Sequence, residues 1–577
     1  MSSRFGRERV QGFLHADGTR IVNGNGEEII LEGYGVGNWL NQEGFMIGGP
    51  AQRLNRMAKG IAESDTGIGT KRTTSMPLRF DRHRTVEQAV RELCGEKYLK
   101  TFWKRWYANH LGEADIRAMA ELDLNSVRLV LNASVFLKEE PEIEWDEDGF
   151  RILEEVLDWC EKYRIYAILD MHGAPGGQSG CMFDDGFDSM PRMFYCEEFR
   201  ERSILLWAEI AKRFGSREIL GGYDLLNEPL SIPDERSIIP ELNRFYDDCI
   251  REVRKYDKKH MFFLEGACFA RNIRTFDHDY DPECHNWAIH LHKYDFSPEI
   301  KDLYPYLLKS EELQVPVWIG EGGSAPGANA VFYSTAAQFG IGYALWCWKT
   351  ALNPVAPDGK GLIHHILPDR WPLISNYFIG GSRPGYKECI EIFDEYLENM
   401  KYENCIKDFG HINITRRKVP FSLAAVAYVH DPVNNRSFSS PWGLGNYLNY
   451  RLEDHTRLVW DNHYPVPLYW MDSFRMEAPH DPLEKLLLEL HPGEFAEYEI
   501  REAPENTVLQ LEGRSPEGAA VDLFMDGVKI GRFSIVACSE DRLTPEQIAI
   551  PVCGEKRFRL TAAEGTVQLK KLHFRKE

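Results

Sequence analysis

The sequence predicts a (β/α)8 TIM barrel followed by a C-terminal antiparallel β-sandwich domain. Eight apolar runs of strand length alternate with amphipathic helical stretches as far as Met400, a pattern typical of a barrel of parallel strands. Beyond Met400, short alternating runs separated by turn signals replace the helical pattern. The 577 residues also exceed what one hydrophobic core usually serves. We therefore expect a catalytic barrel over residues 1–400 and a sandwich over residues 401–577.

Continuous apolar runs predict the barrel strands. They cover Glu27–Val36, Asn125–Leu131, Arg164–Met171, Leu220–Leu226, Met261–Leu264, Trp287–His292, Val315–Ile319 and Ile341–Trp348. Helices with apolar residues three and four positions apart are predicted between them, for example at Ile152–Tyr163, Phe199–Phe214 and Pro240–Tyr256. Continuous apolar strands are typical of a parallel sheet covered on both faces. The active site is then expected at the carboxyl ends of the strands.

A long insertion follows the first predicted strand, spanning about residues 46–110. Its segment Ala51–Arg91 is polar, rich in Arg, Gly and Thr, and shows little periodicity. Long segments without periodicity inside a compact domain are often functional loops. The sequence leaves open whether this one is a lid or a plain loop.

The C-terminal strands are predicted from alternation and from Gly-containing turns. They lie at residues 507–511, 520–524, 531–536 and 558–561, with turns at Asp526-Gly527 and Glu564-Gly565. The stretch from about 410 to 480 is harder to place and could belong to the sandwich, bridge to the barrel, or both. It is rich in aromatic residues, including Trp442, Trp460, Tyr469 and Trp470.

The amino-acid composition limits the classes of molecule that the chain is expected to bind. The formal net charge of −21 disfavours nucleic acid or an anionic membrane, because phosphate recognition relies on clustered Lys and Arg. No run is long and apolar enough to cross a bilayer, and Met1–Arg20 lacks the apolar region of a secretory signal. We expect a cytoplasmic protein, or a secreted one if a leader has been trimmed. The twelve cysteines contain no CxxC pair, which favours reduced thiols over disulfides or a metal site.

Two glutamates directly follow apolar runs. Asn227-Glu228 closes the run that begins at Gly222, and Glu321 closes the run that begins at Val315. Parallel strands would present both carboxylates at one edge of the barrel. Two carboxyl groups about 5 to 5.5 Å apart are the minimum for retaining glycoside hydrolysis, one as acid/base and one as nucleophile.

Other strand ends supply residues suited to a sugar site. They are Trp39, Glu43, Arg128, His172, Asn227, His292, Tyr294 and Trp346. Each alone has a structural explanation, such as an Arg that pairs with a carboxylate. Together at one face they are hard to explain by packing. Arg128 and Tyr294 would keep Glu321 ionised, and the charge of Glu321 would keep Glu228 protonated.

These motifs resemble glycoside hydrolase family 5 of the cellulase superfamily, closest to its exo-β-1,3-glucanase-like branch. The resemblance spans roughly residues 25–395 and rests on the NEP run ending at Pro229 and on four further runs. These are Trp39-Leu-Asn-Gln-Glu43, Leu124-Asn-Ser-Val-Arg128, Leu169-Asp-Met-His-Gly-Ala-Pro-Gly-Gly-Gln178 and Trp346-Cys-Trp-Lys-Thr350. It implies Glu228 as acid/base, Glu321 as nucleophile and Glu43 as a ligand for the terminal sugar. Arg128, His172, Asn227, His292, Tyr294 and Trp346 would line subsite −1, and neither cofactor nor metal is implied.

The expected function is therefore a retaining exo-acting β-glycosidase of the β-glucosidase or exo-β-glucanase type. A glycosidase for a large apolar aglycone, such as a glycolipid or plant conjugate, and a non-catalytic sugar-binding barrel are the alternatives. The presence of both glutamates counts against the non-catalytic barrel. The chain departs from the branch pattern at Ser179-Gly-Cys-Met-Phe183, so its aglycone preference is open. The C-terminal strands loosely resemble a carbohydrate-binding jelly-roll module, with a purely structural sandwich as the alternative.

Overall fold

The computed structural model forms two compact units, each built from discontinuous segments. The barrel unit comprises Met1–Lys293, Tyr304–Gly322 and Gly340–Lys407. The C-terminal unit comprises Tyr294–Leu303, Gly323–Phe339 and Asp408–Glu577. The structure describes residues 4–48, 80–188, 190–231, 238–294, 300–352, 361–378, 381–429, 438–439, 450–451, 456–464 and 482–577. No helix within these ranges has both the length and the apolar character to cross a bilayer.

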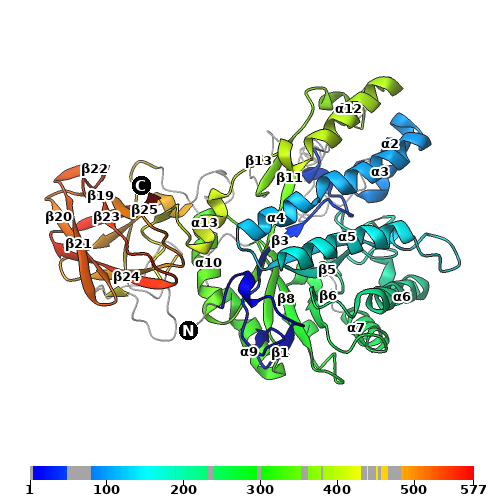
Figure 1. Cartoon of the computed structure of the whole chain (residues 1–577), viewed down its shortest axis with the longest axis horizontal. Helices are drawn as coiled ribbons and strands as arrows, with labels where there is room; N and C mark the ends of the chain where they lie inside the picture. The colour runs from blue at the N-terminus through cyan, green and yellow to red at the C-terminus, as the bar shows by residue number, and fades with distance from the viewer. Residues whose placement is uncertain are drawn as a thin grey trace, which may run out of the picture. The chain divides into compact units, whose positions relative to one another are not determined.

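Eight parallel strands close into a barrel in the order β10-β3-β4-β5-β6-β7-β8-β9, which confirms the predicted TIM barrel (Figure 1). The strands are β3 (Glu32–Val36), β4 (Ser126–Asn132), β5 (Tyr166–Gly173), β6 (Leu220–Asp224), β7 (Met261–Glu265), β8 (Trp287–Lys293), β9 (Val317–Gly322) and β10 (Tyr343–Trp346). Every residue of these strands is buried. A parallel sheet with both faces covered requires such continuous burial, which explains why the predicted runs were apolar throughout.

Two strand boundaries differ from the prediction. The first strand begins at Glu32 rather than Glu27, because the chain up to Glu27 forms a turn in which the N–H of Asn23 bonds to the Glu27 carbonyl. The strand β6 ends at Asp224, three residues before Asn227. Leu225 and Leu226 are nonetheless fully buried. Burial alone does not require a strand, so the expectation that these leucines continue β6 is wrong.

Helices cover the outside of the barrel. Those predicted between the strands are confirmed as α5 (Glu147–Tyr163), α6 (Glu197–Phe214) and α7 (Ile239–Val253). The others in this unit are α2 (His83–Cys94), α3 (Glu96–His110), α4 (Glu113–Glu121), α8 (Ala267–Ala270), α9 (Tyr304–Leu313), α11 (Trp371–Tyr377) and α12 (Tyr386–Asn399). Short strands complete the unit as β1 (His15–Asp17), β2 (Arg20–Val22), β11 (Lys349–Leu352), β12 (Ile363–Ile366) and β13 (Ile406–Lys407).

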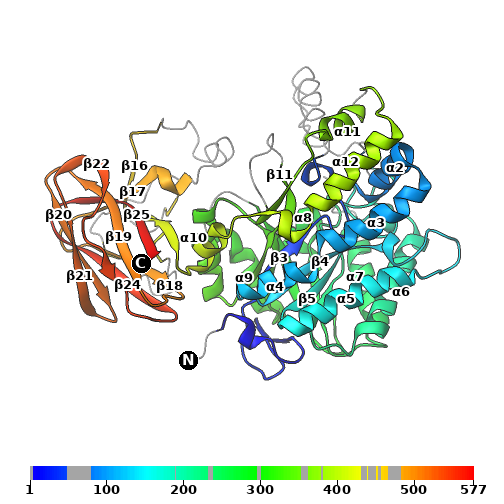
Figure 2. The same ribbon diagram turned by 45° about the horizontal axis from the view of Figure 1, so that its top comes forward.

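The insertion is helical from His83 onward, so the expected lack of periodicity up to Arg91 is wrong there. One face of α2 carries a buried apolar stripe formed by Val86, Val90 and Leu93. The polar residues between them make this helical spacing hard to see in the sequence. Helices α2, α3 and α12 lie side by side (Figure 2). Aromatic rings join α3 to α12, for example Trp106 on Tyr396 with ring centroids 5.6 Å apart. The part of the insertion from 49 to 79 lies outside the described residues.

The C-terminal unit contains two antiparallel sheets, as the sequence predicted. One has the order β16-β17-β25-β19-β22, with β14 on β25 and β23 on β19, and the other has the order β15-β18-β24-β20-β21. Their bounds are β14 (Phe421–Ala424), β15 (Phe438–Ser439), β16 (Arg457–Trp460), β17 (Leu486–Leu490), β18 (Phe495–Ile500), β19 (Thr507–Ser515), β20 (Ala519–Met525), β21 (Val528–Ile535), β22 (Cys538–Leu543), β23 (Ile548–Ala549), β24 (Lys556–Glu564) and β25 (Val567–Lys576).

Residues 410–480 contribute to this unit. Trp460 ends β16, whereas Trp442, Tyr469 and Trp470 lie outside the described residues. Helix α13 (Gly410–Arg416) corrects the expectation that helices stop at Met400.

Helix α10 (Pro326–Gln338) belongs to the C-terminal unit although it lies between β9 and β10 in the sequence. Every residue from Gly327 to Ala337 is buried. Ala330 and Val331 are part of the apolar core of the sandwich strands. The guanidinium of Arg417 also donates to the Ala330 carbonyl at 3.2 Å. A helix that is buried on all sides needs such enclosure, so α10 depends on residues after 408.

Candidate active site

Arg128 is the centre of a polar cluster at the carboxyl ends of the barrel strands. It lies on β4 and is fully buried. Nη1 donates to Oε2 of Glu321 at 2.7 Å, and Nη2 donates to Oδ1 of Asn227 at 3.0 Å. Three more buried carboxylates, which the sequence analysis missed, surround the same guanidinium: Asp224 at 2.8 Å, Glu265 at 3.1 Å and Asp170 at 3.0 Å. The bond to Oδ1 orients the Asn227 amide so that its NH2 end is the one able to donate to a sugar.

Glu228 and Glu321 are the two carboxylates of this cluster that reach its surface. Glu228 is 8% exposed and Glu321 is 6% exposed, whereas the other three are fully buried. One oxygen of Glu228, one oxygen of Glu321 and one ring nitrogen of His292 all lie within 4.8 Å of one another. Carboxyl groups lie about 5 to 5.5 Å apart in retaining glycosidases and about 6.5 to 9.5 Å apart in inverting ones. The separation here fits the retaining geometry.

His292 lies between the two glutamates. Its Nδ1 is 2.7 Å from Oε1 of Glu228 and 3.7 Å from Oε1 of Glu321, and its Nε2 is 3.2 Å from Oε1 of Glu265. Burial raises the pKa of Glu228 and outweighs the opposing hydrogen bond and charge of His292, and the negative charges of Glu321 and Glu265 raise that pKa further. Burial opposes a charge on His292, but the carboxylates of Glu265 and Glu321 hold the pKa of His292 well above its usual range. The Glu228–His292 pair therefore retains a proton at neutral pH.

Two aspartate–histidine pairs lie beneath these groups. His172 Nδ1 is 2.5 Å from Asp170 Oδ2, and His290 Nδ1 is 3.1 Å from Asp224 Oδ1. Burial opposes protonation of His172, but the Asp170 carboxylate raises the pKa of His172 overall. Five carboxylates thus face one arginine and three histidines. The cluster is short of fixed positive charge, so its protons are shared among the histidines and carboxylates.

Trp346 forms an apolar wall beside the cluster. It ends β10, and its indole stacks on the His172 ring with centroids 5.3 Å apart and planes 2° from parallel. Gly35 and Gly37 make room for the indole, since an added Cβ would come within 2.7 Å and 2.6 Å of it. A flat apolar surface next to hydrogen-bonding groups suits the face of a sugar ring.

Residues 87–352, which contain this cluster, match the family model described as cellulase, glycosyl hydrolase family 5. This part of the chain is a glycoside hydrolase family 5 domain. It is 28% identical over 282 residues to a β-xylosidase of Phanerodontia chrysosporium, which covers 49% of this chain and 52% of that protein. It is 29% identical over 164 residues to a glucan 1,3-β-glucosidase of Candida oleophila, covering 28% of this chain and 36% of that one. The chain spans about half the length of the β-xylosidase and endoglucanase relatives that it matches.

Solved structures also resemble this chain. The crystal structure of an endogalactoceramidase is 14% identical, with a TM-score of 0.44, and covers 96% of this chain and 100% of that one. A rutinosidase from Aspergillus niger is 15% identical, with a TM-score of 0.42, and covers 56% of this chain and 91% of that one.

The structure also places the three remaining predicted site residues, Trp39, Glu43 and Tyr294. Trp39 is fully buried, and its indole N–H donates to the Tyr107 carbonyl of α3 at 3.3 Å. Glu43 is 6% exposed, and its backbone N–H donates to the side chain of Asn38 at 2.9 Å. Tyr294 directly follows β8, is partly exposed and belongs to the C-terminal unit. Their contacts with a sugar stay predictions.

The loop after β5 is fixed to the acid/base segment by Gln178. This fully buried side chain donates to the carbonyls of His172 at 2.7 Å and Asn227 at 2.9 Å. The backbone N–H groups of Leu230 and Ser231 continue the link by donating to the carbonyls of Gln178 and Ser179. The last residue of the HGAPGGQ run therefore holds two neighbouring strand ends together.

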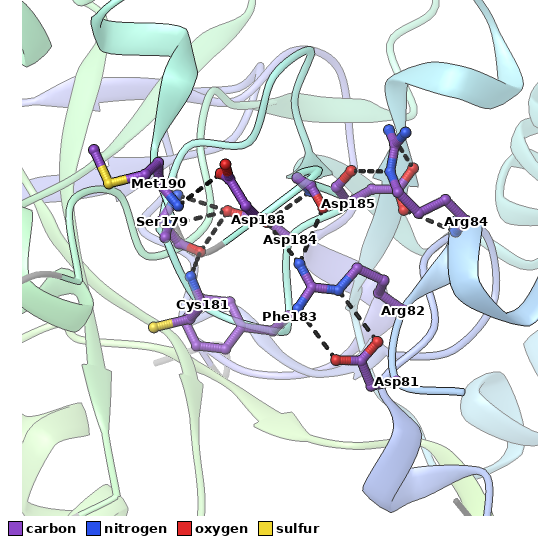
Figure 3. Close-up of polar contacts among 12 residues, drawn as sticks. Asp81, Arg82, Arg84, Ser179, Cys181, Phe183, Asp184, Asp185, Asp188 and Met190 are labelled. Carbon is purple, nitrogen blue, oxygen red and sulfur yellow. Dashed lines mark hydrogen bonds and ion pairs between the residues drawn. The ribbon is translucent and has the colours of Figure 1, made fainter. Parts of the chain in front are cut away.

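Beyond Gln178, a buried aspartate organises the loop in which this chain departs from the branch pattern (Figure 3). Asp184 Oδ2 accepts from the backbone and hydroxyl of Ser179 at 2.9 and 2.6 Å, and its Oδ1 accepts from the Gly186 N–H at 2.8 Å. Arg82, at the start of α2, donates to the Gly186 carbonyl at 3.0 Å, and Arg84 pairs with Asp185 at 3.3 Å. These bonds hold the helical part of the insertion against the loop after β5.

Asp170 and His290 were missed because they lie inside β5 and β8, whereas Asp224 and Glu265 were missed although they end β6 and β7. Asp170 and His172 are two positions apart on β5, and His290 and His292 are two positions apart on β8. Side chains two apart on a strand point to the same face, here the barrel interior. Ionisable residues at this spacing within an apolar run were the available signal.

Three groups of histidine and carboxylate side chains bring possible metal ligands within 4.8 Å of one another in the described part of the chain: Glu265 with His290 and His292, Glu228 with His292 and Glu321, and Asp461 with His463 and Asp541. Arg128 pairs with Glu265 and Glu321, and Lys570 pairs with Asp461 and Asp541. Side chains thus already supply positive charge to each group. That the reaction needs no metal stays a prediction.

Proposed function

We propose that this chain is a retaining, exo-acting β-glycosidase of the β-glucosidase or exo-β-glucanase type. The observation that carries the proposal is the approach of Glu228, which follows β6, and Glu321, which lies on β9, with oxygens within 4.8 Å of one another. This separation suits a covalent glycosyl-enzyme mechanism. The family 5 domain supports a carbohydrate substrate.

In the first step, a carboxylate oxygen of Glu321 attacks the anomeric carbon while the bond to the leaving oxygen breaks. The proton of Glu228 passes to that oxygen, so the aglycone leaves as a neutral alcohol. Arg128 holds the other side of the Glu321 carboxylate at 2.7 Å and keeps it aimed and ionised.

In the second step, water attacks the anomeric carbon and breaks its ester bond to Glu321. Esterification has removed the charge of Glu321, so Glu228 is now more acidic and stands as a carboxylate that takes the water proton. Two inversions give overall retention. Proton NMR of the first product formed by the wild-type enzyme tests this step, and an initial α-anomer from a β-glycoside would exclude the retaining assignment.

Exo action is the finer part of the proposal and depends on Glu43. A carboxylate that accepts hydrogen bonds from the hydroxyls of the terminal sugar leaves no room for a further glycosidic bond. Charged hydrogen bonds contribute about 1.5 to 3 kcal/mol, so Glu43→Ala should lower kcat/KM on the order of ten- to a hundredfold. Monosaccharide should be the only early product from a long oligosaccharide. Early release of di- or trisaccharides would contradict exo action.

A second candidate, a glycosidase for glycosides with a large apolar aglycone, is favoured by an aromatic pair beside Glu228. Phe183 and Phe269 approach from the loops after β5 and β7, with ring centroids 6.1 Å apart. The segment after Glu228 connects to both loops, because Ser231 bonds to Ser179 and the Cys268 N–H donates to the Leu230 carbonyl at 3.2 Å. The leaving group departs on the Glu228 side, so these rings would contact the aglycone.

The exposure of this pair supports the second candidate. Phe269 is 36% exposed, and Cys268, Phe269 and Ala270 all have left-handed backbone conformations. Such strained residues persist where the surrounding structure holds them, often at ligand sites. Activity on alkyl β-glucosides of increasing chain length separates the candidates. If kcat/KM rises with alkyl chain length and Phe269→Ala removes this rise, the apolar aglycone is favoured. If kcat/KM does not change with chain length, the simple glucosidase is favoured. No hydrolysis of any β-glycoside would leave only the sugar-binding barrel.

A further inference from the structure

Glu265 contacts both the acid/base residue and the imidazole next to it, although neither reaction step uses it. It ends β7 and is fully buried. Its Oε2 accepts the backbone N–H of Glu228 at 2.7 Å. Its Oε1 is 3.2 Å from Nε2 of His292, whose Nδ1 is 2.7 Å from the Glu228 carboxyl. One carboxylate therefore holds Glu228 by its backbone and, through an imidazole, by its side chain.

The backbone of Glu228 needs such support. Its φ of +44° is in the left-handed region, which side chains with a Cβ disfavour. The ladder between β6 and β7 ends at Asp224, so strand pairing does not fix this peptide. The bond from the Glu228 N–H to Glu265 takes the place of a ladder bond. Strained residues at active sites persist only where neighbouring groups hold them.

We propose that Glu265 is a positioning residue that fixes the left-handed backbone of Glu228 and orients His292 to share the acid/base proton. The inference rests on the role of Glu228 in the proposed function. Because Nε2 of His292 faces Glu265, Nδ1 is the ring nitrogen that exchanges the proton with Glu228. An acid/base held in this way can deliver its proton without reorganising.

The charge of Glu265 also predicts a pH effect. Burial is the largest cause of the raised pKa of Glu228, and the negative charge of Glu265 adds to it. Removing that charge lets the Glu228–His292 pair lose its proton at lower pH. The other ionisable groups facing these residues are Arg128 on β4, Cys181 in the loop after β5, Asp224 on β6, Tyr246 on α7, His290 on β8 and Glu321 on β9. None of them changes in the variants below.

Glu265→Gln is the main test variant, because it keeps the side-chain shape and removes the charge. Its amide has one accepting and one donating end, so it cannot serve both the Glu228 N–H and the donors Arg128 and His292. Asp281→Asn is the matched control. Asp281 is another buried carboxylate of the barrel unit, which pairs with Arg254 at 2.7 Å and accepts the backbone N–H of Asn286 at 3.0 Å.

Glu265→Gln should lower kcat/KM, which reports the glycosylation step, about ten- to a hundredfold on an alkyl β-glycoside, whose leaving group needs the proton, within the usual range for acid/base groups. On a 2,4-dinitrophenyl glycoside, which needs no proton, the loss should stay below about threefold for the same reason. The alkaline limb of kcat/KM should move to lower pH. Equal losses on both substrates with an unmoved alkaline limb would overturn the inference. Asp281→Asn should change neither the ratio nor the limb.

Glu265→Asp provides a second route if Glu265→Gln fails to fold. It keeps the charge but shortens the reach, so it should retain the alkaline limb and still lose rate on the alkyl glycoside. A normal rate on that substrate would also overturn the inference. Glu228→Gln is measured in parallel to separate the two claims. If Glu228→Gln loses as much rate on the 2,4-dinitrophenyl glycoside as on the alkyl glycoside, the proposed function fails. If Glu228→Gln loses more rate on the alkyl glycoside but the Glu265 variants do not, only the positioning role is refuted.

Discussion

Two buried charge clusters in this chain contain similar residues but differ in charge balance. In the barrel unit, five carboxylates surround Arg128 and three histidines, and two of the carboxylates reach the surface. In the C-terminal unit, Asp461 and Asp541 share Lys570 at 3.0 and 2.9 Å, and Arg514 lies 3.5 Å from Asp461. The first cluster has excess negative charge, whereas the second pairs two carboxylates with two cations.

The comparison separates a cluster built for proton transfer from one built for stability. A balanced cluster satisfies its charges by pairing and has no proton to exchange near neutral pH. In a cluster with excess negative charge, the side chains share protons. A protonated side chain therefore lies next to an ionised carboxylate. Charge balance, rather than the presence of His, Asp and Glu, therefore distinguishes the candidate active site from the sandwich cluster.

Truncation after Lys407 should have the largest effect, because it removes the charge cluster of the C-terminal unit together with most of that unit. The fragment would keep α10 but lose the core that encloses Ala330 and Val331. We expect insoluble or aggregating protein with little activity, because the apolar side chains of a helix that is normally buried on all sides would be exposed. Soluble yield, thermal unfolding and glycosidase activity of residues 1–407 measure this. A soluble, fully active fragment with an unchanged Tm would show that the barrel does not need the C-terminal unit.

Glu321→Ala should abolish activity without harming stability. We expect turnover to fall on the order of 10⁴-fold or more, since the covalent intermediate cannot form. Tm should stay level or rise, because one of five crowded carboxylates is removed. Added azide should restore some turnover and give a glycosyl azide of inverted configuration, which NMR identifies. A near wild-type rate would remove Glu321 from the nucleophile role.

Asp461→Asn, in the C-terminal unit, should lower stability without changing activity. It leaves Lys570 and Arg514 with one carboxylate instead of two, so we expect a loss of about 1 to 3 kcal/mol in unfolding free energy and no change in kcat. Urea unfolding followed by activity assays tests both parts. Asp526→Asn, which breaks the exposed pair with Lys556, is the control and should have no measurable effect. Equal effects of the two variants would mean that the buried cluster contributes no more than a surface pair.

The smallest predicted effect is an opposite pH dependence of local stability in the two units. His172 and His292 have raised folded pKa values, so their contribution is present below their ordinary value of 6.5 and is lost as pH rises through the folded pKa. Burial opposes the charge of Asp461, but Lys570 and His463 lower its pKa. Its contribution is present above 3.8 and lost as pH falls through the folded pKa.

Hydrogen exchange at mildly acidic and alkaline pH measures this contrast, after correction for the intrinsic exchange rate. Peptides from β5 and β8 should lose protection toward alkaline pH, and peptides from β16 and β25 should lose it toward acid. Parallel changes in both units would contradict the difference in charge balance.

The barrel could be predicted because its strands are buried on both faces and their apolar runs are continuous. The boundary at Asp224 could not, because Leu225 and Leu226 are equally buried outside the strand. The assignment of α10 to the C-terminal unit also escaped prediction. An apolar helix between two barrel strands is expected to pack on its own barrel, and sequence alone does not reveal a different core.

The sequence predicted several of the residues that meet in the site, but it missed four of their buried partners. Arg128, Asn227, Glu228, His292 and Glu321 meet as expected. Asp170 and His290 were hidden because a charged residue inside an apolar strand looks like an exception until the barrel brings several together. Asp224 and Glu265 end β6 and β7, but the predicted run continued past Asp224 to Leu226, and the predicted run before Glu265 stopped at Leu264. Arg128 lies 96 positions from Asp224 and 137 from Glu265, and His290 lies 66 positions from Asp224, separations that local patterns do not cover.

The discontinuous C-terminal unit also constrains how the chain is synthesised. Helix α10 emerges before β10 completes the barrel, yet β25, which borders the core of α10, is made roughly 240 residues later. At about 5 to 20 residues per second, the wait lasts on the order of 10 to 50 seconds. During that time the helix lacks its final core while the barrel strands on either side of it are already available. The segment that directly follows the predicted nucleophile is therefore among the last parts of the barrel sequence to reach its native surroundings.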